Sequence, residues 1–268
     1  LIELAQKSLK YSSGGVKISV VIPNYNYERF LYQRMYSILS QKIKFHEILI
    51  LDDCSSDNSR EKIDAIVDSL SPYVSIRKIY NEQNSGSPFK QWQKGFEEAS
   101  GDYIWIAEAD DYCDKRMIKK LIKPIRSSEN IRISYCDTAF INTEGKIILP
   151  TIKNEIDIMN TGHWDDDYVN NGENELKNYT FLNCTIANVS SALIKKDNYN
   201  KYFKMSGEYR QSGDWLFYAN IMQHGNIAYT ASTYNYYRLH GNNVSSTVKK
   251  EAYIKEMTKI YTYFHKLF

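Results

Sequence analysis

Several features are scarce or missing in this sequence of 268 residues, and each excludes a class of protein. Its four cysteines lie far apart without any C-x-x-C spacing, which indicates buried thiols in a reducing compartment rather than a disulfide scaffold. No apolar stretch approaches the roughly 18 to 20 residues of a membrane span, and the first residues lack a signal-peptide core. The net charge is only +2, with acids and bases interspersed, so no nucleic-acid partner is expected. We therefore expect one soluble, cytoplasmic α/β domain, and a phosphate-bearing small molecule stays open as its ligand.

Two common phosphate-binding motifs are also absent. No G-x-G-x-x-G follows the first predicted strand and no G-x-x-x-x-G-K-[ST] occurs, so neither a dinucleotide fingerprint nor a P-loop is present. Gly14 and Gly15 precede that strand, which is the wrong side for a phosphate cradle. A fold that brings a nucleotide to this edge must then neutralise the diphosphate differently, and a metal ion held by carboxylates would do so.

Carboxylates of this kind are present in the stretch 101–114. Tyr103–Ile106 is an apolar run of β-formers, which predicts a strand that is buried on both faces. Three acids follow it directly: Glu108, Asp110 and Asp111. Because ligands of open α/β sheets bind outside the carboxyl ends of the strands, these acids stand at a solvent-facing ligand edge, and their hard oxygens favour Mg²⁺ or Mn²⁺. The alternative is that Asp110 or Asp114 caps the helix that begins near Lys115.

Strands and helices alternate along the first half of the chain. The predicted strands are Lys17–Pro23, Glu47–Leu51, Ser75–Tyr80, Tyr103–Ile106 and Ile131–Tyr135. Apolar residues at helical spacing lie between them, as in Glu28–Ser40 and Lys115–Ile125. This alternation predicts a Rossmann-like α/β domain whose mainly parallel sheet is flanked by helices.

The second half is less regular. The polar stretch Thr143–Asn178 predicts a functional loop or lid, Asp214–Gln223 a helix, and Ile227–Tyr237 a strand. Residues 1–16 are interpreted as a connector from a preceding module, 17–246 as the main domain, and 247–268 as a C-terminal amphipathic helix. Packing on its own domain or on a neighbouring module is the favoured role of this basic helix, and lying on an anionic membrane surface is the alternative.

Five segments then carry a resemblance to a known family. They are VVIPNYN (Val20–Asn26), ILILDDCSSDNS (Ile48–Ser59), GDYIWIAEADD (Gly101–Asp111), SGDW (Ser212–Trp215) and YRLHGNNVS (Tyr237–Ser245). In this order they resemble the successive motifs of family 2 glycosyltransferases of the GT-A fold. The resemblance covers roughly Lys17–Ser246 and implies a nucleoside diphosphate sugar as donor, with a hydroxyl of a glycan or lipid-linked glycan as acceptor.

The resemblance also implies roles for individual residues. The base and ribose would lie against Pro23, Asn24, Tyr25 and Asp52, and Asp52 would accept a hydrogen bond from a uracil or thymine N–H. Asp110 would contact ribose or metal-bound water, and Asp111 would hold the Mn²⁺ or Mg²⁺ ion that bridges the diphosphate. Asp214 matches the catalytic base. Arg238 and His240 match residues near the diphosphate, while Trp164 and Trp215 are candidates for acceptor contact.

Some positions depart from the family pattern. Glu108 stands where Asp is frequent, Cys54 stands where Gly is common, and Gly213 replaces the acid that often precedes the base. No Q-x-x-R-W sequence occurs, so a processive synthase is not expected. Non-catalytic roles stay open: Asp52 as a turn acid, Asp214 as a helix N-cap and His240 as a surface residue.

These observations favour a metal-dependent, inverting glycosyltransferase that builds a bacterial surface polysaccharide. A sugar nucleotidyltransferase is the alternative enzyme, although such enzymes usually carry a Gly-rich loop after the first strand and Asn24–Arg29 contains no glycine. A catalytically inactive module that binds a nucleotide sugar or a glycan is the non-enzymatic alternative.

Overall fold

The computed structural model describes the chain except residues 129, 198, 204–208, 210 and 242–249. Its strands are β1 (Ile18–Asn24), β2 (Glu47–Asp52), β3 (Ile76–Tyr80), β4 (Tyr103–Ile106), β5 (Tyr112–Cys113), β6 (Ile131–Ile141), β7 (Ile147–Leu149), β8 (Tyr168–Asn171), β9 (Ala192–Lys195) and β10 (Asn226–Arg238). Its α-helices are α1 (Ile2–Ser8), α2 (Leu31–Leu39), α3 (Ser59–Leu70), α4 (Pro88–Glu98), α5 (Met117–Ser127), α6 (Lys153–Ile156), α7 (Gly172–Glu175), α8 (Tyr199–Tyr202), α9 (Gly213–Met222) and α11 (Lys250–Leu267). A π-helical turn (Leu176–Thr180) and a 3₁₀ turn (Val189–Ser191) precede β9.

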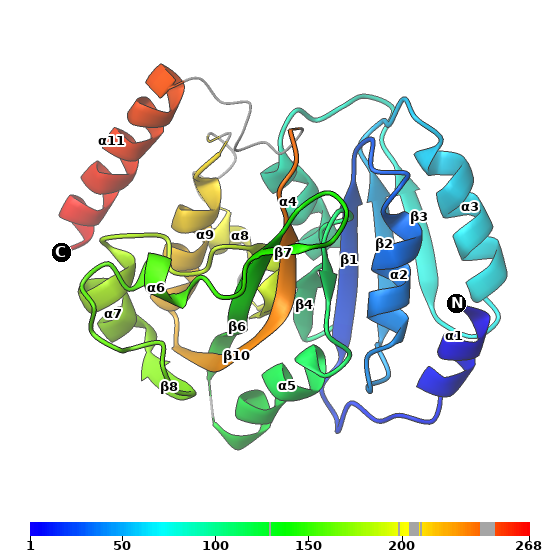
Figure 1. Cartoon of the computed structure of the whole chain (residues 1–268), viewed down its shortest axis with the longest axis horizontal. Helices are drawn as coiled ribbons and strands as arrows, with labels where there is room; N and C mark the ends of the chain where they lie inside the picture. The colour runs from blue at the N-terminus through cyan, green and yellow to red at the C-terminus, as the bar shows by residue number, and fades with distance from the viewer. Residues whose placement is uncertain (129, 198, 204–208, 210, 242–249) are drawn as a thin grey trace.

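The strands form a ten-stranded sheet whose main path is β3-β2-β1-β4-β9-β6-β10-β5, with β7 and β8 off this path. Figure 1 shows β3, β2 and β1 side by side. The first four strands in this order are parallel, as predicted for the first half of the chain. β9 then runs antiparallel to both β4 and β6, and β10 runs parallel to β6. β5 and β8 pair antiparallel with β10, and β7 pairs antiparallel with β6. The predicted α/β fold is confirmed, with a parallel half and a mixed half.

Alternate residues of the central strands enter two separate cores, because successive side chains of a strand point to opposite faces. In β1, Val20 packs with α2 and α3, whereas Val21 packs with α4 on the other face. Ile50 and Leu51 of β2 divide in the same way. Both faces are therefore covered by helices, which explains why these strands are uninterrupted apolar runs in the sequence.

The segment predicted as a polar lid is packed onto the sheet instead. It contains β7, α6, β8 and α7, and four of its apolar residues belong to the core beneath α9: Ile152, Ile156, Trp164 and Leu176. The lid prediction is therefore wrong for this part of the chain. These few apolar residues lie at irregular spacing in a polar sequence, so no periodicity indicated that each of them is buried.

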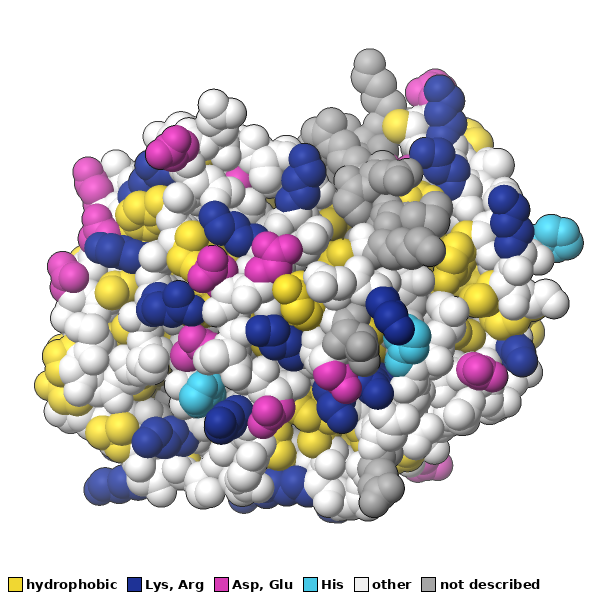
Figure 2. Space-filling view, turned by 180° about the vertical axis from the view of Figure 1, so that it is seen from behind, with side chains coloured by type: hydrophobic (Ala, Val, Ile, Leu, Met, Phe, Trp, Pro, Cys, Tyr) yellow, Lys and Arg dark blue, Asp and Glu magenta, His cyan; other side chains and the backbone are white. Residues whose placement is uncertain are grey.

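Both ends of the described chain pack on the same fold. α1 buries Ala5 against the core formed with α2 and α3, and α11 buries Ile260 and Phe264 beside α9. The predicted C-terminal helix is thus confirmed over Lys250–Leu267, while the boundary placed between residues 246 and 247 lies outside the described residues. In the described part of the chain, no helix combines the length and apolar character that crossing a membrane requires. Figure 2 shows basic and acidic side chains interspersed over one face, in line with the small net charge.

Candidate active site

Polar residues that follow three of the parallel strands meet in a cavity of about 820 Å³. Asn24 ends β1, Asp53 follows β2 and Glu108 follows β4, so the cavity lies at the carboxyl edge of these strands. Asp214, in the first turn of α9, lines the same cavity. The other predicted site residues in its lining are Pro23, Tyr25, Asp110, Asp111 and Trp215. The fold therefore gathers acids from distant segments at the edge where open α/β sheets bind their ligands.

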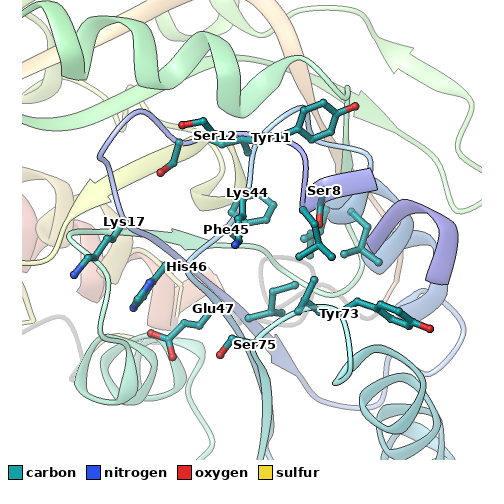
Figure 3. Close-up of a pocket in the computed structure, with 17 residues that line it drawn as sticks. Ser8, Tyr11, Ser12, Lys17, Lys44, Phe45, His46, Glu47, Tyr73 and Ser75 are labelled. Carbon is teal, nitrogen blue, oxygen red and sulfur yellow. The ribbon is translucent and has the colours of Figure 1, made fainter. Parts of the chain in front are cut away.

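A second cavity, of about 500 Å³, lies at the opposite edge of the sheet (Figure 3). Lys17 and His46, which precede β1 and β2, line it together with Ser75, which precedes β3. The Glu47 carboxylate beside them accepts hydrogen bonds from the Ser19 and Ser100 hydroxyls, at 2.7 and 2.6 Å. This cavity stands at the amino ends of the strands, where ligand binding is not expected for such a sheet.

Asp52 does not reach the active-site cavity, contrary to its predicted contact with a base. Its side chain is 0% exposed, and its carboxylate accepts hydrogen bonds from Asn24 Nδ2 (2.9 Å), Arg60 Nε (2.9 Å) and the Ser55 backbone N–H (3.0 Å). Burial alone would raise the pKa of Asp52, but the hydrogen bonds from Ser55, Arg60 and Asn24 outweigh it, and the pKa is lowered. Asp52 is therefore an ionised acid that joins β1, β2 and α3.

Asp53 is the acid of this pair that lines the cavity. Its Oδ1 accepts hydrogen bonds from Gln91 Nε2 (2.8 Å) and from the Ser85 backbone (2.9 Å), and its Oδ2 accepts one from the Ser85 hydroxyl (2.7 Å). The next residue, Cys54, has a φ of 64°, in the left-handed region that favours glycine. This backbone conformation explains why Gly is common at this position in the family, and Cys54 adopts it although it carries a side chain.

Asp111 is buried at the cavity and held by three hydrogen bonds. Asp111 is 1% exposed, and it accepts hydrogen bonds from Asn188 Nδ2 (3.0 Å), the Ser190 hydroxyl (2.8 Å) and the Arg238 backbone N–H (3.0 Å). Asp111 therefore lines the cavity as a buried acid that three donors hold, and the expectation that it is solvent-facing is wrong.

The capping alternative holds for neither Asp110 nor Asp114, because the N-cap residue of α5 is Arg116 and no side chain makes a capping hydrogen bond there. The Asp114 carboxylate accepts the Arg116 backbone N–H (2.8 Å) just before α5, whereas the Asp110 carboxylate faces the cavity and His240. Asp110 is therefore not used as a helix cap, and its place in the cavity agrees with a ligand-binding role.

The acids after β4 repel one another in a buried setting. Burial and the charge of Asp110 raise the pKa of Glu108 to about 8, and the same two causes raise the pKa of Asp111. The Arg34 guanidinium opposes both shifts; it is fully buried 5.1 Å from the Trp105 ring, and its nitrogens have no hydrogen-bond partner among the described residues. Hard, crowded carboxylate oxygens of this kind suit a divalent cation.

The described residues contain no group of three or more His, Cys, Asp or Glu side chains arranged as a complete metal site. A site of one or two carboxylates is the arrangement expected where substrate phosphates supply further ligands to Mg²⁺. Asp110 and Asp111 are therefore the residues that could hold the ion.

Arg238 and His240 support the acids instead of lining the cavity. Arg238 is 1% exposed, and its guanidinium donates to the backbone oxygens of Asp110 (2.7 Å) and Thr143 (2.9 Å) and to Gln33 Oε1 (2.7 Å). His240 Nε2 is hydrogen-bonded to Asp110 Oδ2 at 2.9 Å, and its ring stacks on Phe30. Neither side chain belongs to the described cavity lining, and their predicted contact with the diphosphate stays a prediction. The rest of the motif, residues 242–245, lies outside the described residues.

Asp214 lies in the first turn of α9, after the N-cap residue Ser212. Its Oδ1 accepts the Trp215 backbone N–H at 2.8 Å, so it satisfies one helix N–H without being the N-cap. Burial is the main cause that raises the pKa of Asp214 to about 7, and the charge of Glu256 adds to it. A carboxylate with a pKa near neutrality is suited to proton transfer.

The two tryptophans predicted to contact an acceptor differ in position. Trp215 lines the cavity, and its Nε1 donates to the Thr180 carbonyl at 2.7 Å. Trp164 lies in the core, where its Nε1 donates to the Tyr135 hydroxyl at 3.0 Å and its indole packs beside His163. Trp164 is therefore a structural residue, and its predicted acceptor contact is wrong.

Several residues of the site were not indicated by any motif. Asn188 and Ser190 hold Asp111, Trp92 donates to Glu108 at 2.6 Å, and Tyr253 and Met257 of α11 complete the cavity wall. They come from segments far apart in the sequence, so only the fold brings them to the acids. Spacing within one segment carries no signal for such contacts.

Comparison with known proteins gives a family. The family model described as "Glycosyl transferase family 2" matches residues 19–203. An uncharacterized glycosyltransferase of Nostoc is 31% identical over 121 residues, which are 45% of this chain and 36% of the relative. The poly(ribitol-phosphate) beta-N-acetylglucosaminyltransferase TarS of Staphylococcus aureus is 31% identical over 107 residues, which are 39% of this chain and 18% of TarS.

A solved structure shows the same fold. The crystal structure of Staphylococcus aureus TarS in complex with UDP-GlcNAc superimposes with a TM-score of 0.66 at 18% identity. The superposition covers 91% of this chain and 65% of the TarS 1–349 chain, so this chain spans less than two thirds of that part of TarS. The GT-A fold expected from the motifs is therefore confirmed.

Proposed function

The chain belongs to glycosyl transferase family 2, and we propose that it transfers a sugar from a nucleoside diphosphate to a hydroxyl of a growing surface glycan. The observation that carries this proposal is the single cavity that joins Asn24, Asp53, Asp110 and Asp111 to Asp214. The residues that follow the parallel strands would supply polar groups and a cation site for a nucleoside diphosphate. Asp214 of α9 would supply the carboxylate that activates the acceptor hydroxyl.

The nucleoside would lie against Pro23, Asn24 and Tyr25. Asn24 Oδ1 is buried without a hydrogen-bond partner among the described residues, so it is available to a donor on the ligand. We assign recognition of a uracil or thymine N–H to Asp53 rather than to Asp52, because Asp53 lines the cavity and Asp52 does not. UDP-GlcNAc in the TarS complex is an example of such a donor.

A Mg²⁺ or Mn²⁺ ion fits this site, since Asp110 and Asp111 offer hard carboxylate oxygens in a crowded, buried setting. Asp111 would hold the ion, and Asp110 would contact ribose or a metal-bound water. The ion supplies positive charge that stabilises a leaving diphosphate. Arg238 and His240 act on the diphosphate indirectly, because they fix the positions of the two acids.

Asp214 would remove the proton of the acceptor hydroxyl. A single base that activates an in-line attack inverts the configuration at the anomeric carbon, whereas a double displacement needs a further nucleophile. Gly213 occupies the neighbouring position where a second acid is often found, so Asp214 is the acid of its motif. Trp215, next to it in the cavity wall, would contact the acceptor.

A peripheral contact with an anionic membrane surface is a further part of the proposal, and the protein would then act at the inner face of that membrane. Ile254 and Tyr261 are seven residues apart on α11, and they are each at least 50% exposed, as is Phe268 directly after the helix. Lys255 and Lys259 of the same helix are also exposed. Such a basic amphipathic face suits a lipid-linked acceptor. Sedimentation with anionic and with neutral vesicles tests this contact.

The function itself is tested by a thermal-shift screen of nucleoside diphosphates and nucleotide sugars with and without Mn²⁺. A ligand selective for the native state stabilises it by about 2.7 kcal/mol at a hundred times its dissociation constant. Released nucleoside diphosphate is then measured with each stabilising donor. Hydrolysis or transfer would exclude an inactive binding module, whereas binding without any turnover of donors or acceptors would favour it.

A further inference from the structure

The C-terminal helix forms part of the active-site cavity. Tyr253 and Met257 of α11 line it together with Asp214. Between them, Glu256 points a carboxylate at the start of α9: its Oε2 accepts the backbone N–H groups of Ser212 at 2.9 Å and Gln211 at 3.2 Å. One carboxylate thus reaches the turn that leads into the helix of the proposed base.

This contact supplies acceptors that the start of α9 lacks locally. Gln211 and Ser212 directly precede Gly213, the first residue of α9, and a carboxylate beside the start of a helix is favoured by the helix dipole. Ser212 is the N-cap residue of α9, but its side chain makes no capping hydrogen bond. Asp214 follows two residues later, so whatever fixes the backbone of Ser212 also fixes the position of Asp214.

α11 is anchored firmly enough to serve this purpose. The Tyr263 hydroxyl donates to Asn220 Oδ1 and accepts from Gln223 Nε2, each at 2.8 Å, which ties the far end of α11 to α9. Phe264 packs on the Trp215 ring at a centroid distance of 5.7 Å. The two helices therefore form one unit, with Glu256 held at the cavity end.

We propose that Glu256 is a positioning residue for Asp214: it holds the Gln211–Ser212 turn so that Asp214 faces the acceptor, without itself contacting a substrate. This inference rests on the proposed function. It assigns to α11 a part in the reaction that the family motifs, which end before this helix, do not describe.

Electrostatics give a second readout. Among the described residues, three titratable groups interact electrostatically with Asp214. Glu256 on α11 raises the pKa of Asp214. Asp214 in turn raises the pKa of Tyr218 on α9 and of Cys184 in the segment before the 3₁₀ turn. Burial has the largest effect on the pKa of Asp214, and Glu256 raises it further. Removing the Glu256 charge lowers this pKa, so the acid side of the pH–rate profile moves to lower pH. A merely structural role would not move it.

The test compares Glu256→Gln, Glu256→Ala and, as a control on the exposed face of the same helix, Glu251→Gln. Glutamine can still accept both N–H groups, so Glu256→Gln should keep kcat within about threefold at pH 8 and move the acid limb to lower pH. Alanine removes the acceptor, and kcat should fall at least about tenfold with KM for the donor unchanged, because small misplacements of catalytic groups are costly. Glu251→Gln should match the parent in both respects.

An unshifted pH profile in Glu256→Gln would overturn the proposal, as would parental kcat in Glu256→Ala. If the alanine variant does not fold, the glutamine variant and its pH profile still decide. The proposed function fails separately, namely if the parent protein turns over no nucleotide sugar, and that result is obtained before any variant is compared.

Discussion

Replacing Asp214 by Asn separates its proposed catalytic role from its place in the first turn of α9. Asn keeps an oxygen that can accept the Trp215 N–H, so the local backbone contact can persist. A positioned general base contributes about 10² to 10⁴ in rate, so turnover should fall at least about a hundredfold. Donor affinity should change little, because Asp214 would face the acceptor and not the nucleotide.

The pH dependence follows from the raised pKa of Asp214. With a pKa of about 7, the fraction ionised is about half at pH 7 and about 3% at pH 5.5. Turnover of the parent should therefore rise about tenfold per pH unit below pH 7 and level off above it. The Asn variant should lack this inflection, and the anomeric configuration of the product, determined by NMR, should be inverted in the parent.

Stability should change in the opposite direction to activity. The pKa of Asp214 is raised in the folded state from 3.8 to about 7, so the folded protein binds the proton more tightly and its stability falls as pH rises from about 4 to about 7. Three units correspond to about 4 kcal/mol, and partial exposure at the cavity wall reduces this to roughly 2 kcal/mol. Asn cannot ionise, so Asp214→Asn should be more stable than the parent at pH 8, by about 4 to 8 °C in Tm, and not at pH 4.

Turnover within a few fold of the parent, or a retained anomeric configuration, would refute the role of Asp214 as base. Equal stability of the two proteins at pH 8 would instead refute the raised pKa. Thermal unfolding at both pH values and steady-state kinetics on the same preparations make these outcomes distinct.

Three further predictions concern the other side of the cavity and the core. Asp111→Asn should abolish the Mn²⁺-dependent part of UDP affinity in calorimetric titrations. Asp111→Ala should in addition lower the free energy of unfolding by about 1 to 3 kcal/mol, because three donors lose their acceptor. Equal UDP affinity with and without metal in the parent would contradict this prediction. UDP or dTDP should bind more tightly than CDP by roughly 1 to 3 kcal/mol, and Asp53→Asn should narrow that difference; preference for CDP or a purine nucleotide would show that the base pocket is misassigned. Trp164→Phe should lower the free energy of unfolding by about 1 to 3 kcal/mol, since the Tyr135 hydroxyl loses a buried partner, and should leave kcat unchanged. A selective rise in KM for the acceptor would instead place Trp164 in the acceptor site.

The sequence predicted the fold best where all the residues of a pattern lie in one segment of the chain. The uninterrupted apolar runs ending at Pro23, Leu51 and Ile106 predict buried parallel strands, and the polar residues after them predict a ligand edge, because both follow from neighbours along the chain. The structure agrees on these points, and the order of the five motifs was enough to indicate the family that the comparisons give.

Apolar runs in the sequence were sufficient to predict β1 to β4 and the edge of the sheet that carries the acids. They did not show that the predicted strand Ile131–Tyr135 lies in the mixed half, next to antiparallel β9. Only the folded structure shows that Asp53 and not Asp52 lines the cavity and that Trp164 lies in the core. It also shows that the Arg238 guanidinium donates to backbone oxygens and to Gln33 Oε1. The physical reason is that adjacent residues share composition and spacing, while the direction of a side chain and the partners that satisfy its hydrogen bonds come from distant segments. Asn188 beside Asp111 and Glu256 beside Ser212 are such partners, and they meet only when the chain folds.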